Sequence, residues 1–158
     1  MSLGGYASLA YAARQEHKVG GVMLAGCSTE IRGLPLGPYR RLSPYVARMM
    51  GLGSESWHVV TEMLTAMQGY SALKDLRSTR LPVWIVNGRR DPLRLSERRF
   101  VAARPDARLT VLPRAGHDVN LHAPTAFNRV LLHALEDLRG NPRNPVVHHA
   151  GMPVGVAA

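Results

Sequence analysis

Three residues of the sequence, Ser2, Asp91 and His117, carry the side chains that nucleophilic chemistry at a carbonyl carbon needs. Ser2 begins SLGGYASLAYAAR, a run of small residues that predicts a helix over residues 3–14, so its hydroxyl should be exposed at the start of that helix. Such a hydroxyl attacks a carbonyl when a histidine takes its proton and a carboxylate orients the histidine. The backbone N–H of Leu3 would then face the developing oxyanion.

Asp91 and His117 each follow a segment that we predict to be a buried strand. The first of these segments, LPVWIVN, covers residues 81–87, and the second, RLTVL, covers residues 108–112. A third run, VGGVMLAGC, lies earlier in the chain at residues 19–27. Short apolar runs bounded by turn residues are typical of strands that are buried on both faces of a sheet.

Helical stretches separate these three runs, which predicts parallel strands joined by crossover helices and an α/β fold class. In a parallel sheet the carboxyl ends of the strands open on one edge, so Ser2, Asp91 and His117 should reach one crevice. About 55 residues separate the first two runs, too many for a bare loop. Besides the helix at residues 3–14, we predict helices over residues 54–67, 70–76, 96–103 and 124–139.

The composition describes one ordinary globular domain with an excess of basic residues. The chain has 158 residues, long enough to bury a core, and a formal net charge of +9. Lys18 and Lys74 are its only lysines among 20 basic residues, and the arginines are scattered instead of clustered. Nucleic-acid binding depends on clustered positive charge, so we predict no nucleic-acid partner. A basic binding module remains an alternative interpretation.

The sequence also bears on location and on cofactors. A single cysteine, Cys27, excludes an internal disulfide and is compatible with a reducing compartment. No run approaches the roughly 18 apolar residues of a membrane span, so we expect no membrane association and a cytoplasmic location. We predict no cofactor and no metal, because no common zinc spacing occurs among His117, Asp118 and His122 or at His148 and His149.

The strings SLGGYASLAYAAR, LPVWIVNGRRDP and LPRAGHDVNLHAPTAFNRVL resemble the elbow helix, acid loop and histidine loop of the α/β-hydrolase superfamily, especially its esterase-like members. The order Ser, Asp, His along the chain is also the order of that superfamily. The resemblance implies that Ser2 is the nucleophile, Asp91 the acid, His117 the base, and Leu3 the source of one oxyanion-hole amide. It implies hydrolysis of a small-molecule carboxylic ester or related acyl bond.

The resemblance covers residues 2–138, and it implies a partial α/β-hydrolase domain with three C-terminal parallel strands and a small helical lid insert at about 31–78. Residues 139–158 contain three prolines and no periodicity, and we predict a disordered tail there.

The sequence departs from the superfamily pattern G-x-S-x-G because only Met1 precedes Ser2. We therefore expect a truncated form that lacks the strand before the serine and the loop supplying the second oxyanion-hole amide. One hypothesis is a misassigned start, in which an upstream frame encodes the missing strand. The alternative is a non-catalytic remnant that needs a partner to fold. In either case the first strand should have an unpaired apolar edge that favours self-association.

Overall fold

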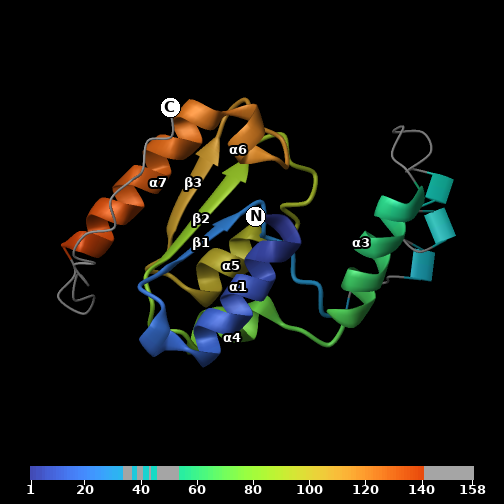
Figure 1. The fold of residues 1–158 in the computed structure, drawn as a ribbon, viewed down its shortest axis with the longest axis horizontal. Coiled ribbons are helices and arrows are strands. Elements are labelled where there is room, and N and C mark those ends of the chain that lie inside the picture. The colour runs from blue at the N-terminus through green and yellow to red at the C-terminus, as the bar shows by residue number, and fades with distance from the viewer. Residues whose placement is uncertain (34–36, 39–40, 43, 46–53, 141–158) are drawn as a thin grey trace, which may run out of the picture.

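The computed structural model describes residues 1–33, 37–38, 41–42, 44–45 and 54–140. Its centre is a parallel sheet of three strands in the order β1-β2-β3 (Figure 1). Residues pair in register across it, with Val22 opposite Val83 and Trp84 opposite Arg108. The predicted α/β class is confirmed. The strands are β1 (Val22–Ala25), β2 (Val83–Gly88) and β3 (Arg108–Leu112).

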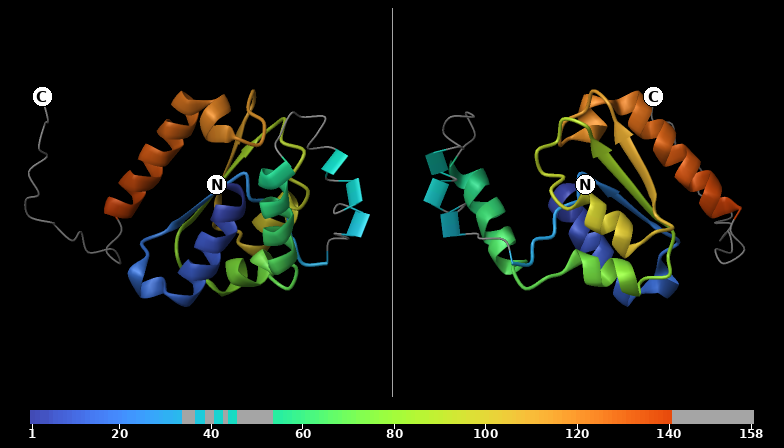
Figure 2. Two further views of the ribbon diagram at one scale, coloured as in Figure 1. Left: turned by 45° about the vertical axis from the view of Figure 1, so that its right-hand side comes forward. Right: turned by 180° about the vertical axis from the view of Figure 1, so that it is seen from behind.

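Helices cover both faces of this sheet. Figure 2 shows α1, α4 and α5 on one face and α6 and α7 on the other, while α3 lies to one side. Within the described ranges, no helix has the length and hydropathy that a bilayer span requires. The helices are α1 (Ser2–Arg14), the 3-10 helix η1 (Glu16–Lys18), α3 (Ser54–Ala66), α4 (Ala72–Ser78), α5 (Glu97–Ala103), α6 (Val119–His122) and α7 (Pro124–Arg139).

Two apolar clusters hold the layers together, one on each face of the sheet. Successive side chains of a strand point to opposite faces, so Ile85 belongs to one cluster and Val86 to the other. Every residue of β2 is buried, as expected for a central strand between two helical layers. The α1 side of the core is built around Leu9, Leu24, Leu76, Ile85 and Phe100, and the α7 side around Ala25, Val86, Leu112, Ala115 and Val119.

The strand bounds differ from the sequence prediction mainly at β1. The predicted run began at residue 19, but the strand begins at Val22, where its partner β2 begins at Val83. It ends before Gly26, whose φ of +62° leaves the extended conformation. Two short helices, η1 and α6, were not predicted, because three or four residues carry no helical periodicity.

The predicted lid insert, residues 31–78, is described in part. Its last helix, α4, packs into the core through Ala72, Leu73 and Leu76. Residues 34–36, 39–40, 43 and 46–53 of the insert lie outside the described residues. The predicted disordered tail also lies outside them from residue 141 onward.

The outer edge of β1 has no strand partner among the described residues. The Val22 N–H donates to the Pro82 carbonyl just before β2, and the Gly26 N–H donates to Val86 in β2. The amides of Met23 and Ala25 therefore point away from the sheet. A groove of about 470 Å³ lies here, lined partly by Tyr11, Val22 and Met23. Self-association through this edge stays a prediction.

Two adjacent glycines of α1 should respond in opposite ways to alanine. A Cβ at Gly5 would lie 2.2 Å from the Sγ of buried Cys27, whereas a Cβ at Gly4 meets nothing within 4 Å. We expect Gly4→Ala to stabilise the protein by about 0.5–1 kcal/mol through helix propensity. Gly5→Ala should destabilise it by about 1–3 kcal/mol through overpacking. Urea unfolding of both variants tests this, and equal shifts would contradict the packing of α1 on Cys27.

Candidate active site

The structure brings Ser2, Asp91 and His117 together at the carboxyl ends of the strands. Ser2 is the first residue of α1, Asp91 lies in the loop after β2, and His117 lies in the loop after β3. The His117 Nε2 is 2.9 Å from the Ser2 Oγ, and the His117 Nδ1 is 3.0 Å from the Asp91 Oδ2. These distances permit proton transfer from the serine to the imidazole and orientation of the imidazole by the carboxylate.

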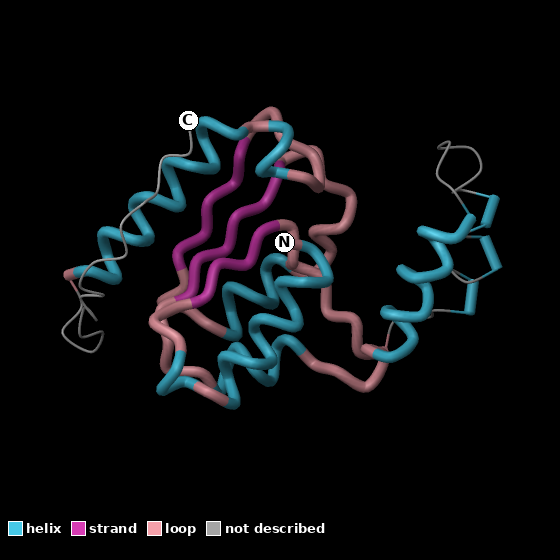
Figure 3. Tube along the Cα trace, in the orientation of Figure 1, coloured by secondary structure: helices cyan, strands magenta, loops and turns pink. Residues whose placement is uncertain are grey.

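Ser2 occupies a tight turn at the start of α1. Its φ is +48°, and it is the only residue other than glycine with a positive φ in the described ranges. A non-glycine residue in this region costs about 1–3 kcal/mol, and such strain is common where a side chain must be aimed at a reaction site. The Cys27 Sγ supports the turn from below by donating to the Ser2 carbonyl at 3.0 Å. The N-terminus therefore lies beside the carboxyl end of β1 (Figure 3).

The Leu3 amide lies in the first turn of α1, where backbone N–H groups have no acceptor within the helix. The first bond within the helix runs from the Gly5 N–H to the Met1 carbonyl. The Leu3 N–H directly follows Ser2 in the chain and has no acceptor within α1. Its predicted oxyanion-hole role stays a prediction.

Asp91 is only 5% exposed and is held from several sides. Its Oδ1 accepts the Leu93 N–H at 2.8 Å, which leaves Oδ2 for His117. Its own N–H donates to the Gly88 carbonyl at 3.1 Å and closes the turn after β2. The carboxylate therefore presents one defined oxygen to the imidazole.

Glycines at the ends of β1 and β2 let the histidine loop approach. A Cβ at Gly26 would lie 2.9 Å from the His117 carbonyl oxygen and 3.4 Å from its ring. A Cβ at Gly88 would lie 2.1 Å from the Gly116 carbonyl oxygen. The role of Gly26 could not be predicted from the sequence, because its contact with His117 joins the end of β1 to a loop far along the chain.

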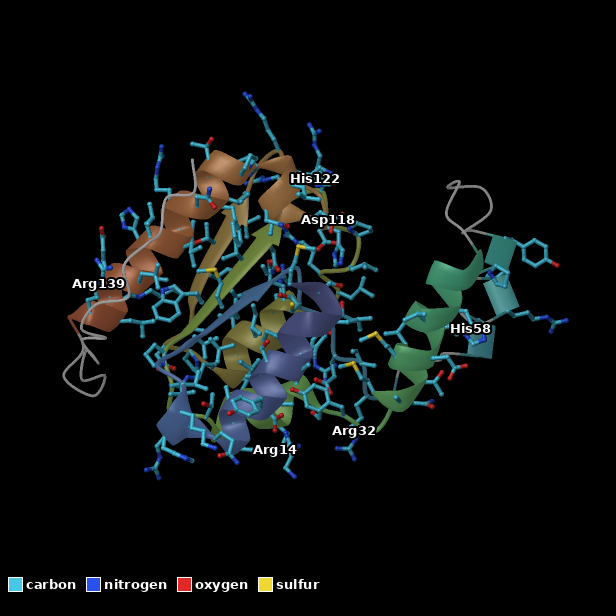
Figure 4. All side chains as sticks on the ribbon, viewed as in Figure 1. Arg14, Arg32, His58, Asp118, His122 and Arg139 are labelled. Atoms are coloured by element: carbon cyan, nitrogen blue, oxygen red, sulfur yellow. The ribbon has the colours of Figure 1, made fainter. Side chains whose placement is uncertain are left out.

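His122 supports the histidine loop from α6. Its Nδ1 accepts the Gly116 N–H at 3.3 Å, and it lies close to Asp118 at the end of the molecule where α6 begins (Figure 4). No group of three or more metal-ligating side chains occurs in the described ranges. His148 and His149 lie outside them.

Cys27 is completely buried beneath Ser2, and this burial raises the pKa of its thiol from the ordinary 9.0 to about 11. A folded-state pKa above the unfolded value means that the thiol's contribution to stability is complete below about pH 9 and is lost as the pH rises to about 11. Two pKa units correspond to about 3 kcal/mol. We expect the free energy of unfolding to fall more steeply over this range in the wild type than in Cys27→Ala.

Urea unfolding at a series of pH values measures this difference. Burial also raises the pKa of Tyr6 and of Tyr70, so both proteins should lose stability above about pH 10. The test is the difference in the free energy of unfolding between the wild type and Cys27→Ala, which should shrink as the pH rises. Parallel curves for the wild type and Cys27→Ala would contradict the burial effect.

Comparison with known proteins identifies the fold. No family model and no curated protein matches the sequence. Among solved structures, a carboxylesterase of the thaumarchaeon Nitrososphaera gargenis is 20% identical, with a TM-score of 0.69 over 87% of this chain and 63% of its own. A thermophilic esterase is 22% identical, with a TM-score of 0.65 over 87% of this chain and 64% of its own.

A third match is MGS-MChE2, an α/β hydrolase from the sediment metagenome of the Mar Chica lagoon. It is 21% identical, with a TM-score of 0.61 over 86% of this chain and 58% of its own. The chain therefore spans about three fifths of the length of these solved structures. The three parallel strands and flanking helices correspond to part of the α/β-hydrolase fold.

Proposed function

We propose that this chain with the α/β-hydrolase fold supplies the catalytic triad of a serine hydrolase that acts on carboxylic esters or related acyl bonds. The observation that carries the proposal is the pair of hydrogen bonds that joins Ser2 through His117 to Asp91. The strained turn at Ser2 adds support, because a nucleophile in such a turn is exposed to a substrate.

In the proposed acylation step, the Ser2 Oγ attacks the carbonyl carbon of the substrate while the His117 Nε2 removes its proton. The carbonyl oxygen becomes an oxyanion, and the Leu3 N–H stabilises it. Asp91 stabilises the imidazolium. The tetrahedral intermediate then collapses, the leaving group takes the proton from His117, and the acyl group stays on Ser2.

Deacylation follows the same route in reverse. Water replaces the leaving group, His117 removes a proton from it, and the resulting oxygen nucleophile attacks the acyl carbon. The acid product leaves with one oxygen from water, and the proton returns to the Ser2 oxygen. The proposed chemistry uses only side chains and backbone amides, so we propose no metal or organic cofactor.

The substrate class rests on the names of similar proteins and on the nucleophile. Two of the similar structures are described as a carboxylesterase and an esterase. Ser2 is a hydroxyl nucleophile, which suits transfer of an acyl group from a small-molecule ester. We propose the cytoplasm as its location.

Labelling with a fluorophosphonate probe tests the proposal directly, since the probe reacts with a serine that has been activated by a neighbouring base. We expect the 158-residue chain to label at Ser2 and the Ser2→Ala variant not to label. Ser8→Ala is a matched control, because Ser8 also lies in α1 but its hydroxyl only donates to the Gly4 carbonyl. Peptide mapping should place the label on the first helix.

A folded wild type that does not label would contradict the proposal. Labelling that survives in Ser2→Ala would contradict the assignment of the nucleophile. An insoluble or unfolded chain that becomes active only with a partner would support the alternative interpretation, a remnant that does not fold alone.

A further inference from the structure

A buried hydrogen-bond network lies behind the loop that carries Asp91. Asn87, the second-last residue of β2, is 0% exposed. Its side-chain amide donates to the Glu97 Oε2 at 2.7 Å and to the Ser28 Oγ at 2.8 Å. A buried amide and a buried hydroxyl are tolerated only when they have such partners, and the charged acceptor makes the bond to Glu97 the stronger one.

The network joins three segments that are distant in the sequence. Ser28 follows β1, Asn87 lies near the end of β2, and Glu97 begins α5. Asp91 lies in the loop between Asn87 and Glu97. The hydrogen bond between these two side chains therefore joins the two ends of that loop. A backbone bond from the Ser96 N–H to the Ser28 carbonyl, at 2.8 Å, reinforces the same junction.

Arg94 connects this network to the turn that holds Asp91. Its Nη2 is 3.4 Å from the Glu97 Oε1, and its Nη1 donates to the Gly88 carbonyl at 3.4 Å. That carbonyl also accepts the Asp91 N–H at 3.1 Å. The charge on Glu97 therefore orients Arg94, and Arg94 reaches the same backbone oxygen that fixes the Asp91 turn.

We infer that Glu97 is a positioning residue for the triad, and that it acts through Asn87 and Arg94 to hold the Asp91 carboxylate at hydrogen-bond distance from His117. The inference rests on the proposed function. The loop has no strand or helix of its own between β2 and α5, so this network supplies the constraint that regular structure would otherwise give. A displacement of a reacting group by about 1 Å can cost about 100-fold in rate.

Two substitutions at Glu97 separate its roles. Glu97→Gln keeps an oxygen that can accept from Asn87 but loses the charge that orients Arg94, so it should lower the labelling rate less than Glu97→Leu does. Glu97→Leu removes both the acceptor and the charge, and should lower the rate constant of Ser2 labelling by about 10- to 100-fold with little change in probe affinity. Glu136→Leu is the control, because Glu136 is an exposed carboxylate on α7.

A proton NMR measurement provides a readout that does not require catalysis. The proton shared between the His117 Nδ1 and Asp91 should give a strongly downfield resonance in the wild type and in Glu97→Gln. It should be weakened or lost in Glu97→Leu. If Glu97→Leu does not fold, Arg94→Met tests the same link at a partly exposed side chain, and it should cause a smaller fall in labelling and a weaker resonance.

The outcomes separate this inference from the proposed function. Folded Glu97→Leu with wild-type labelling and an unchanged resonance would overturn the positioning role. If the wild type shows the resonance but Ser2 does not label, the proposed function fails, and the resonance of the variants alone decides the role of Glu97. A fall in the labelling rate of Glu136→Leu equal to that of Glu97→Leu would also overturn the positioning role of Glu97.

Discussion

The Asp91→Asn variant should acylate Ser2 about 10⁴-fold more slowly than the wild type while keeping its fold. The reason lies in the two oxygens of the carboxylate. Oδ1 accepts the Leu93 N–H at 2.8 Å, so the amide of the variant must place its oxygen there. Its NH₂ group then faces the His117 Nδ1, which has to accept a hydrogen bond and loses its proton.

This change of tautomer moves the imidazole proton to Nε2, which then no longer accepts the proton of Ser2. Labelling by the fluorophosphonate probe and hydrolysis of an activated aryl ester measure the loss, and thermal unfolding verifies the fold. Asp118→Asn is the control, because it removes the same charge from the residue next to His117. Asp91→Asn with wild-type labelling would show that Asp91 does not orient the imidazole.

Gly88→Ala should impair both stability and acylation. Its Cβ would lie 2.1 Å from the Gly116 carbonyl oxygen and 2.4 Å from that of Ala115, and backbone oxygens cannot rotate away as a side chain can. The acid loop and the histidine loop must separate, which breaks the bond from the Arg90 N–H to the Ala115 carbonyl. We expect a loss of about 1–3 kcal/mol in stability and about 100-fold in labelling rate.

Gly69→Ala provides the comparison, since a Cβ at Gly69 meets no atom within 4 Å. Urea unfolding and labelling at a temperature where both variants are folded separate the two effects. If Gly88→Ala matches Gly69→Ala in both measurements, the two loops do not approach as closely as the structure places them.

The sequence predicted the parts of the fold that depend on local pattern. The continuous apolar runs identified the three strands, and the run at residues 108–112 coincides with β3 (Arg108–Leu112). The small and apolar spacing of α1 and α7 identified those helices. Because parallel strands open on one edge, the positions of Asp91 and His117 after two strands predicted their meeting with Ser2.

Contacts between distant segments that neither a strand end nor a recognised motif brings together could not be predicted from the sequence. The bond from Asn87 to Ser28 joins residues 59 apart, and nothing in either neighbourhood distinguishes these polar residues from exposed ones. Gly26 likewise leaves room for the His117 carbonyl, and this close approach is visible only once the loop after β3 has been placed. The start of β1 at Val22 was missed because its partner strand, and not its own apolar run, sets that limit.

The bond between Ser2 and His117 closes a chain segment of 115 residues. Because loop-closure entropy opposes such a contact, we expect it to form only after α1 has docked on β1 and all three strands have paired. Any opening that releases either end of the segment separates Ser2 from His117. The proposed acylation of Ser2 would therefore slow whenever the sheet opens, and its rate would measure sub-global unfolding.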